Sequence, residues 1–482
     1  MTPALLPSRL PGFLVQEVDP TPMPEPYPVA WNAPLARELG IEASLADRDW
    51  LALLAGNRIP DGTRPVAAGY AGHQFGTWVP QLGDGRAIQL GDLEDSGHRR
   101  HEIQLKGAGR TRWSRTGDGR AVLRSTIREY LASAAMAGLG IPTTRALAIV
   151  GSDLPVYRER TETAAVLTRV ATTHIRFGSF EWLASQRRET EVRQLADQVI
   201  EQHFPALLSL PAAERHAAWY HEVVTRTARL MAMWIAAGFS HGVMNTDNFS
   251  IVGDTLDYGP YGWLDRYDPR SICNHSDWAG RYAFDQQPMV GLWNCARLGE
   301  ALYPLVSEDD ALATLESYRG SYESTVVELL RARLGLATPA EDDDALIGDF
   351  LDLLRTSGSD YHRSFRALSR WDDSDRATLA LREEISDHAG LDAWLARYRE
   401  RLAHEQRSHR ERNAAMLLVN PRYVLRNWVA QEVIERAEAG DHAVVDQVRE
   451  LLDNPFDEHQ GLERWAAAPP AGADEIVVSC SS

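Results

Sequence analysis

The stretch HGVMNTDNFSIVGDTLDYGP, residues 241–260, decides how the rest of the chain is interpreted. It follows an apolar helical run and opens with a polar loop that contains Asp247 and Asn248. A short β-like run, residues 249–252, then leads to Asp257 in the sequence Asp-Tyr-Gly. Two carboxylates and an amide therefore lie at the two ends of one predicted hairpin. Oxygen ligands in this arrangement suit Mg²⁺, which takes few protein groups and keeps its other positions for water and substrate phosphates.

The same stretch resembles the catalytic loop and the metal-binding Asp-Phe-Gly of protein kinases, where an Asn and a later Asp hold the ions that bridge nucleotide phosphates. Asn248 corresponds to that Asn and Asp257 to that Asp. Counted from His241, the position of the kinase catalytic Asp falls on Val243, which cannot accept a proton. Asp247 is the nearby carboxylate that could replace it. The alternative for an Asp-Asn pair in a loop is turn chemistry, because both side chains close turns.

Length and composition indicate a globular chain. Its 482 residues are 44% hydrophobic, which is enough for two or three domains or for one elaborated domain. No run of about 18 apolar residues occurs, so no transmembrane helix is expected. Prolines interrupt the opening MTPALLPSRLPGFLV and no basic segment precedes a long apolar one, so we expect no secretion signal. Cys273, Cys295 and Cys480 exclude a disulfide framework and a zinc site made of cysteines alone, and we expect a cytoplasmic protein.

Charge distinguishes one segment from the rest of the chain. The formal net charge of −18 argues against binding nucleic acid through its phosphates, because that binding needs a cationic surface. Between Arg99 and Arg128, however, basic side chains outnumber acidic ones by nine to two. Such an island suits a small polyanion such as a nucleotide triphosphate, and the alternative is a solvated Arg-rich face. The basic residues are Arg99, Arg100, Lys106, Arg110, Arg112, Arg115, Arg120, Arg124 and Arg128.

A strand and a helix in this region form a second recognisable pair. Residues 102–106 alternate between polar and apolar, which predicts a strand with its apolar side chains in a core and Lys106 aimed at a polar cleft. After a basic, glycine-rich loop, a helix is predicted from about residue 120 to 137, with Ile127 and Leu131 on its apolar face and Glu129 off that face. In kinases a strand Lys pairs with a helix Glu and is thereby oriented toward phosphates. The alternative is a chance pair.

The remaining pattern is β-rich up to about residue 170 and helical later. A tight turn, Gly83-Asp84-Gly85-Arg86, precedes a predicted strand, and its small residues would let the backbone approach phosphates; an ordinary hairpin turn is the alternative. Further β-like runs at 146–150, 155–158 and 164–170 would complete an antiparallel sheet of about five strands. Residues 189–238, and the chain from about 287 onward, follow a helical pattern.

Longer segments resemble the selenoprotein O family, described in bacteria as a YdiU-like group. They are QLGDGR, EIQLKGAGRTRWSRTGDGRAVLRSTIREYL, TRVATTHIRFGSFE, HGVMNTDNFSIVGDTLDYGPYGWLD, ICNHSD and the terminal SCSS. The resemblance extends over nearly the whole chain. It implies a pseudokinase that lacks the usual catalytic Asp, in agreement with Val243. It also implies ATP held in a flipped orientation, so that AMP passes to protein hydroxyls; some members transfer UMP.

The resemblance further implies a role for individual residues. Asp247 is implied as the proton acceptor, and Asn248 and Asp257 as ligands of Mg²⁺ or Mn²⁺. The Arg-rich loop after Lys106 can supply positive charge over the β- and γ-phosphates when pyrophosphate leaves. Nucleotide contacts are implied for Gly83, Gly85, Arg86, Lys106 with its partner Glu129, Asp118, Gly119, Arg169, Arg176 and Asp257.

Two cysteines suggest a regulatory hypothesis. Eukaryotic relatives in the family carry selenocysteine near the C-terminus, and this chain has Cys480 in the corresponding tail, so selenium chemistry is absent. A reversible disulfide between Cys273, which follows the metal loop, and Cys480 could pin the tail over the site, since cytosolic disulfides are usually regulatory. The alternative is two unrelated thiols.

We therefore predict an α+β protein with a protein-kinase-like, two-lobed pseudokinase fold. Its predicted parts are an N-terminal extension (1–65), a nucleotide-binding N-lobe (66–185), a C-lobe core (186–300) and a helical C-terminal region with the Cys-bearing tail (301–482). The predicted reaction moves AMP from ATP, or UMP from UTP, to Ser, Thr or Tyr hydroxyls of partner proteins with Mg²⁺ or Mn²⁺, without nucleic acid or membrane. The alternatives are γ-phosphoryl transfer, which Val243 disfavours, and a nucleotide-binding scaffold, which the full metal-and-base set disfavours.

Overall fold

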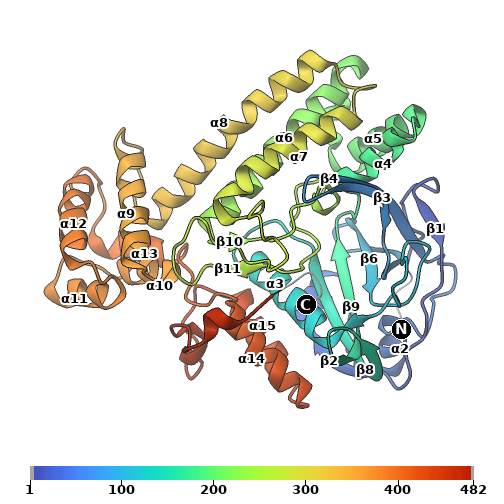
Figure 1. The fold of residues 1–482 in the computed structure, drawn as a ribbon, viewed down its shortest axis with the longest axis horizontal. Helices are drawn as coiled ribbons and strands as arrows, with labels where there is room; N and C mark the ends of the chain where they lie inside the picture. Colours follow the sequence, from blue (N-terminus) through green and yellow to red (C-terminus); the bar gives the residue numbers. More distant parts are fainter. Residues whose placement is uncertain (1–4, 479–482) are drawn as a thin grey trace.

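The protein is an α+β structure, described by a computed structural model for residues 5–478. Its strands are β1 Val15–Glu17, β2 Tyr27–Trp31, β3 Val66–Gln74, β4 Thr77–Gly83, β5 Ala87–Glu94, β6 Arg100–Lys106, β7 Ala121–Val122, β8 Arg145–Tyr157, β9 Thr161–Ala171, β10 Phe239–Ser240 and β11 Gly262–Trp263. The strands up to β9 gather at one end of the molecule (Figure 1). The rest of the molecule is mainly helical.

The helices are α1 Ala33–Glu38, α2 Arg48–Leu54, α3 Leu123–Gly138, α4 Phe177–Ser185, α5 Glu189–His203, α6 Ala212–Ala236, α7 Gln287–Ala301, α8 Glu308–Arg333, α9 Asp343–Ser357, α10 Tyr361–Leu368, α11 Asp375–Glu384, α12 His388–Leu402, α13 His409–Leu417, α14 Asn427–Glu438 and α15 Ala443–Asp453. Helices α6 to α13 form the middle and the opposite end of the molecule, whereas α2, α4 and α5 lie beside the strands (Figure 1). Helices α6, α7 and α8 run side by side (Figure 1). None of the described helices is long and apolar enough to cross a membrane.

The main sheet is antiparallel and larger than the pattern predicted. It contains nine strands in the order β1-β3-β5-β6-β9-β8-β2, with β4 paired to β3 and β7 to β9. The expected runs 146–150 and 155–158 are one strand, β8, whose register shifts between Ser152 and Pro155. Proline cannot donate to a strand ladder, and a bulge accommodates it. That local irregularity made one strand look like two.

The first 65 residues were predicted to be an extension packed on the body, but they contribute two strands to the main sheet. Strand β1 pairs with β3 at one edge, and β2 pairs with β8 at the other. Helices α1 and α2 cover one sheet face, where Trp50 and Leu53 share a core with Leu105. Strands as short as these carry too little alternation to be recognised in sequence.

Helix α3 covers the other face of the sheet. Its predicted apolar residues Ile127 and Leu131 are fully buried in the largest core cluster, together with Leu167 of β9. Helices α14 and α15 then pack on the outside of α3. The polar side chain of Lys106 lies on this α3 side, because side chains alternate along β6 and Leu105 faces the α1–α2 side. The predicted facing of this strand is confirmed.

The loop after α6 is anchored at both of its ends. Helix α6 ends before Gly238, whose φ of 64° lies in the left-handed region that glycine tolerates. Strands β10 and β11 then pair, and a ring nitrogen of buried His241 lies 3.0 Å from the carbonyl oxygen of Leu256. The predicted strand 249–252 is reduced to single bridges, of which one joins Phe249 to Thr255. The predicted hairpin is therefore a short turn that still brings Asp257 back to the loop.

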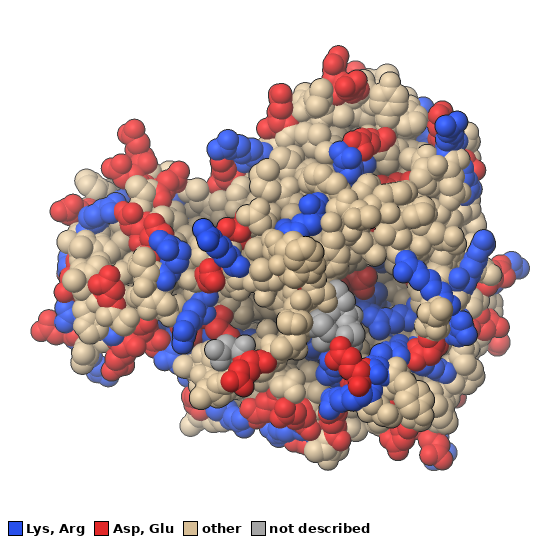
Figure 2. All heavy atoms as spheres, viewed as in Figure 1, with Lys and Arg blue, Asp and Glu red and all other residues tan. Residues whose placement is uncertain are grey.

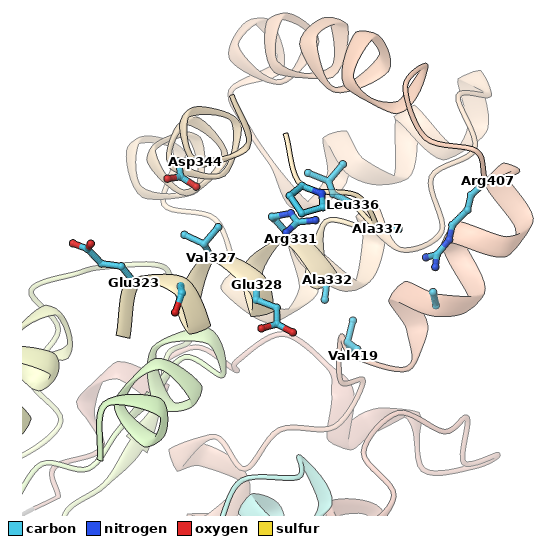
Figure 3. A pocket seen from close by; sticks show the side chains of 14 residues that line it. Glu323, Val327, Glu328, Arg331, Ala332, Leu336, Ala337, Asp344, Arg407 and Val419 are labelled. Carbon is cyan, nitrogen blue, oxygen red and sulfur yellow. The ribbon is translucent and has the colours of Figure 1, made fainter. Parts of the chain in front are cut away.

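The C-terminal helices form a separate core and enclose a pocket. Phe350, Trp371 and Trp394 belong to this core. Figure 3 shows the pocket, of about 790 Å³, with residues of α8 on one side and Asp344 of α9 on another. None of the predicted site residues lines it.

Candidate active site

A network of buried charges lies where the loop after α6 meets the sheet and α3. Lys106 Nζ on β6 is 2.5 Å from Glu129 Oε2 on α3. Arg169 on β9 bridges the two ends of the network: its Nε is 2.5 Å from Glu129 Oε1, and its Nη2 is 2.6 Å from Asp257 Oδ1. Lys106 Nζ also lies 3.5 Å from Asp257 Oδ1. The structure therefore brings four of the predicted residues into mutual contact.

Arg176, which precedes α4, joins this network to the loop. Its Nη1 donates to the backbone carbonyl of Asp247 at 2.8 Å and lies 3.6 Å from Asp257 Oδ2. Its guanidinium stacks over the ring of Tyr70 on β3, 4.5 Å from the centroid. Arg176 thus holds both acidic segments of the loop at a fixed distance from the sheet.

The network carries more positive than negative charge. Burial opposes ionisation of Asp257, but Arg169, Lys106 and Arg176 hold the pKa of Asp257 well below its usual range. Burial and the neighbouring Arg169 lower the pKa of Lys106. Three cations face two carboxylates, Glu129 and Asp257, so an anion entering the site would be attracted. Figure 2 shows basic side chains gathered in a hollow on this face of the molecule.

Asp247 is a buried carboxylate with unused hydrogen-bonding capacity. It is 6% exposed, and its Oδ2 accepts a hydrogen bond from Gln74 Nε2 at 3.4 Å. Its Oδ1 is buried without a partner among the described residues. Burial raises the pKa of Asp247 to about 7. A carboxylate that titrates near neutrality is suited to accept a proton from a substrate hydroxyl.

Asn248 and Asp257 supply the oxygen atoms that a hard divalent cation prefers. Asn248 Nδ2 donates to the carbonyl of Val243 at 3.0 Å, which leaves the amide oxygen for other contacts. The described residues contain no cluster of three or more His, Cys, Asp or Glu side chains that could hold a metal alone. A two-residue oxygen set fits Mg²⁺ or Mn²⁺, which accept phosphate oxygens in their remaining positions.

The predicted turn residues lie against a tryptophan. A Cβ atom on Gly83 would lie 2.4 Å from Cγ of Trp113, and one on Gly85 would lie 2.9 Å from the Trp113 carbonyl oxygen. In this structure the small size of both glycines therefore accommodates the loop 107–120. Arg86, next to this turn, is exposed.

The second predicted pair of loop residues, Asp118 and Gly119, has structural partners. Asp118 accepts from Arg158 Nη1 at 2.8 Å and from the Arg120 backbone at 2.9 Å. A Cβ on Gly119 would lie 2.2 Å from the carbonyl carbon of Gly109, so the two ends of the basic loop touch. Neither residue contacts the charge network directly, and their predicted nucleotide contacts stay predictions.

The basic island is divided between internal ion pairs and the loop. Arg99 pairs with Asp95, Arg100 with Asp92, and Arg124 with Glu162. Arg128 donates to the carbonyl of Tyr261. These four arginines already contact carboxylates or backbone carbonyls of the protein, so they are not free to bind a phosphate. Arg120 is also buried and donates to the carbonyl of Pro22 at 3.0 Å. The island as a whole is therefore not one phosphate-binding surface, and the remaining loop arginines are Arg110, Arg112 and Arg115.

Sequence reasoning missed the contribution of β3 to the site. Gln74 bonds Asp247, Tyr70 stacks on Arg176, and the His73 backbone donates to Thr246 Oγ1 at 2.7 Å. The sequence feature that could have indicated this contribution is the run of small residues in GYAGHQFG, which allows another segment to approach the strand closely. A Cβ on Gly72 would lie 2.7 Å from Asp247 Oδ1, so only glycine allows β3 to approach this closely.

Replacing Glu129 by Gln is expected to lower the free energy of unfolding by about 3 kcal/mol, because it leaves Lys106 and Arg169 buried with one carboxylate fewer. Urea unfolding followed by tryptophan fluorescence measures the loss. Glu38→Gln is the matched control, since the Glu38–Arg145 pair is 3.6 Å long and its Glu38 side chain is 48% exposed. The control should cost less than about 1 kcal/mol. Equal losses in the two variants would contradict the buried-network interpretation.

Comparison with known proteins gives the class of this enzyme. The family model described as protein adenylyltransferase SelO matches residues 8–453. A relative named protein nucleotidyltransferase YdiU from Myxococcus xanthus is 50% identical over 477 residues, covering 98% of this chain and 97% of that protein. Proteins of the same name from Thioalkalivibrio sulfidiphilus and Vibrio cholerae are 51% and 47% identical, each again covering 98% of this chain and 97% of their own.

The protein is therefore an enzyme of the nucleotidyltransferase class. The chain belongs to the protein adenylyltransferase SelO family.

Proposed function

We propose that this protein transfers AMP from ATP to Ser, Thr or Tyr hydroxyls of other proteins and releases pyrophosphate, with UTP as a second donor of UMP. The observation that carries the proposal is the buried network of Lys106, Glu129, Arg169 and Asp257 beside the nearly neutral-titrating Asp247. A strand Lys paired with a helix Glu, followed by a loop after a long helix, also supports a kinase-like, two-lobed arrangement.

The charge network would bind the phosphates of the nucleotide. Lys106, Arg169 and Arg176 supply the surplus positive charge and are fixed by their partners, so little reorganisation accompanies binding. Asn248 and Asp257 would hold Mg²⁺ or Mn²⁺, and the bound cation would neutralise phosphate charge.

Asp247 would act on the acceptor. Its carboxylate takes the proton of the attacking hydroxyl, whose oxygen forms a bond to the α-phosphorus. The bond between the α-phosphorus and the oxygen that bridges it to the β-phosphorus breaks, and pyrophosphate leaves with that electron pair. Arg169 and Lys106 stabilise the charge that develops on the leaving group. Positioning and electrostatics therefore provide most of the rate, as in phosphoryl transfer generally.

Mass spectrometry of an acceptor protein tests the proposal. The purified enzyme is incubated with the acceptor, ATP and either Mg²⁺ or Mn²⁺ under reducing conditions. An acceptor that gains the mass of an adenosine monophosphoryl group supports the proposal. An acceptor that gains only the mass of a phosphoryl group indicates the kinase reaction instead. An unmodified acceptor, with ATP binding demonstrated, indicates a scaffold.

We also propose that Cys273 and Cys480 form a reversible disulfide that regulates the site. Cys273 Sγ lies 3.1 Å from the carbonyl oxygen of Pro260, close to the loop. The His275 backbone donates to the Val478 carbonyl at 2.9 Å, so the chain approaches Cys273 just before its last residues. Cys480 itself lies outside the described residues.

Non-reducing peptide maps of the oxidised protein are expected to contain a Cys273–Cys480 cross-linked peptide that disappears in Cys480→Ala. Cys295→Ala is the control and should keep the cross-link, because burial raises the pKa of Cys295 to about 12 and so keeps that thiol unreactive. An oxidised wild type without the cross-linked peptide would contradict the proposal.

A further inference from the structure

A groove of about 1550 Å³ opens beside the catalytic loop. Its floor is the chain between residues 270 and 286, and one wall is formed by α7 and α8. Phe75, in the turn between β3 and β4, lines its inner end. The groove is separate from the charge network, because none of Lys106, Glu129 or Asp257 lines it.

The groove exposes large apolar side chains. Trp278 is 91% exposed, Met289 63% and Leu312 54%, and all three line the groove. Apolar side chains gathered in one hollow mark a surface that binds a partner, whereas single exposed apolar residues do not. An aromatic or aliphatic side chain of a partner would bury its surface here.

The inner end of the groove adjoins the proposed base. Phe75 lies with its ring 5.1 Å from that of Tyr282, and its backbone donates to Asn245 Oδ1 at 3.2 Å. The preceding residue, Gln74, donates to Asp247. Gln74 therefore links Phe75, which lines the groove, to Asp247, the carboxylate that would accept the proton of the acceptor hydroxyl.

The groove also contains a cation, Arg281, that has no carboxylate partner in the part of the chain that the structure describes. The Arg281 guanidinium stacks over Trp293, 4.8 Å from the ring centroid, and its buried Nε has no hydrogen-bond partner among the described residues. Three acids line the groove, Asp277, Asp285 and Glu316. Asp277 accepts from the backbone nitrogens of Arg281 and Tyr282, and Asp285 accepts from Gln286 Nε2. Arg281 also lies beneath the β3–β4 turn, since a Cβ on Gly76 would lie 3.1 Å from its guanidinium carbon. An acidic side chain of a partner would complete this contact.

We propose that this groove binds an extended segment of the acceptor protein, in which an acidic side chain near the acceptor hydroxyl meets Arg281 and a large apolar side chain packs on Trp278. The proposal rests on the proposed function, because it assigns the groove to the acceptor of that reaction. It predicts that acceptor choice depends on residues flanking the hydroxyl rather than on the hydroxyl alone.

Three synthetic peptides of equal length, each with one Tyr, test the proposal. The first has Glu and Leu near the Tyr, the second has Lys in place of Glu, and the third has Ala in place of Leu; none contains Ser or Thr. Transfer from α-labelled ATP gives kcat and KM, and dye-labelled peptides give binding by fluorescence anisotropy. The wild type should prefer the first peptide by about tenfold in KM, the size of one charge-assisted contact.

Arg281→Glu should reverse the preference between the Glu and Lys peptides. Trp278→Ala should raise KM for the first peptide while kcat changes little, and it tests the groove even if Arg281→Glu fails to fold. The matched controls are Arg376→Glu, an exposed arginine on α11, and Tyr157→Ala, 75% exposed at the end of β8. Neither control should change peptide preference.

The outcomes separate the groove from the reaction. Equal use and equal binding of the three peptides by the wild type overturns the groove proposal, as do effects no larger than those of the controls. Peptide binding that depends on Arg281 and Trp278, without any transfer of label from ATP, contradicts the proposed function. The groove would then bind peptides but would not position an acceptor for transfer. Transfer with reversed preference in Arg281→Glu supports both.

Discussion

Asp247→Asn is expected to reduce the rate of transfer by roughly 10²- to 10⁴-fold while ATP remains bound, because the variant lacks a proton acceptor but keeps the shape of the side chain. Asp247 lies beside the charge network, and the ion pairs that hold Lys106 and Arg169 do not involve it. These two cations therefore remain in place to bind the phosphates in the variant. The turnover number with an acceptor protein and the Kd of a fluorescent ATP analogue are the two measurements.

Asp254→Asn is the control for Asp247→Asn. Asp254 lies on the same stretch of chain, and burial also raises its pKa, to about 6, but it is outside the charge network. Its replacement should leave the turnover number within about twofold of the wild type, as expected for a group outside the reaction. If Asp247→Asn retained full transfer, Asp247 would not be the base.

Asp257→Ala is expected to have opposite effects on ATP binding with and without a divalent cation. With Mg²⁺, the variant loses a metal ligand and its affinity for ATP should fall by at least about tenfold. Without metal, the affinity should rise, because Lys106, Arg169 and Arg176 lose the carboxylate that competes with phosphate for them. Transfer should be lost in both conditions.

Titration calorimetry in Mg²⁺ and in chelator measures both effects of Asp257→Ala, with Asp254→Ala as the control. The informative quantity is the ratio of the two dissociation constants. The account requires this ratio to change strongly in Asp257→Ala and to stay constant in the control. An equal loss of affinity in both conditions would mean that Asp257 serves the fold rather than the cation.

Local pattern was sufficient for the elements that carry the charge network. Alternation placed Lys106 opposite the core face of its strand, and helical spacing placed Ile127 and Leu131 in a core, as the structure confirms. Both inferences use contacts between residues that are close in sequence. The ion pair with Glu129 was predicted from the kinase arrangement of a strand Lys and a helix Glu, and the structure confirms the contact.

Other features could not be predicted, because they depend on contacts between distant parts of the chain. Gln74 and Asp247 are far apart in sequence, and no local period relates them. Strands β1 and β2 are recognisable only from the strands they pair with. Arg124 pairs with Glu162 and Arg128 donates to the carbonyl of Tyr261, and because both partners are distant in sequence the charge pattern did not separate these two arginines from those of the loop.

Label transfer from ATP tests the central claim most directly. The enzyme is given an acceptor protein, Mg²⁺ or Mn²⁺, and ATP labelled at either the α- or the γ-phosphate, with Asp247→Asn as the inactive control. The account predicts that the acceptor is labelled only from the α position and that Asp247→Asn removes this label. Label that reaches the acceptor only from the γ position would contradict the account and make this protein a kinase.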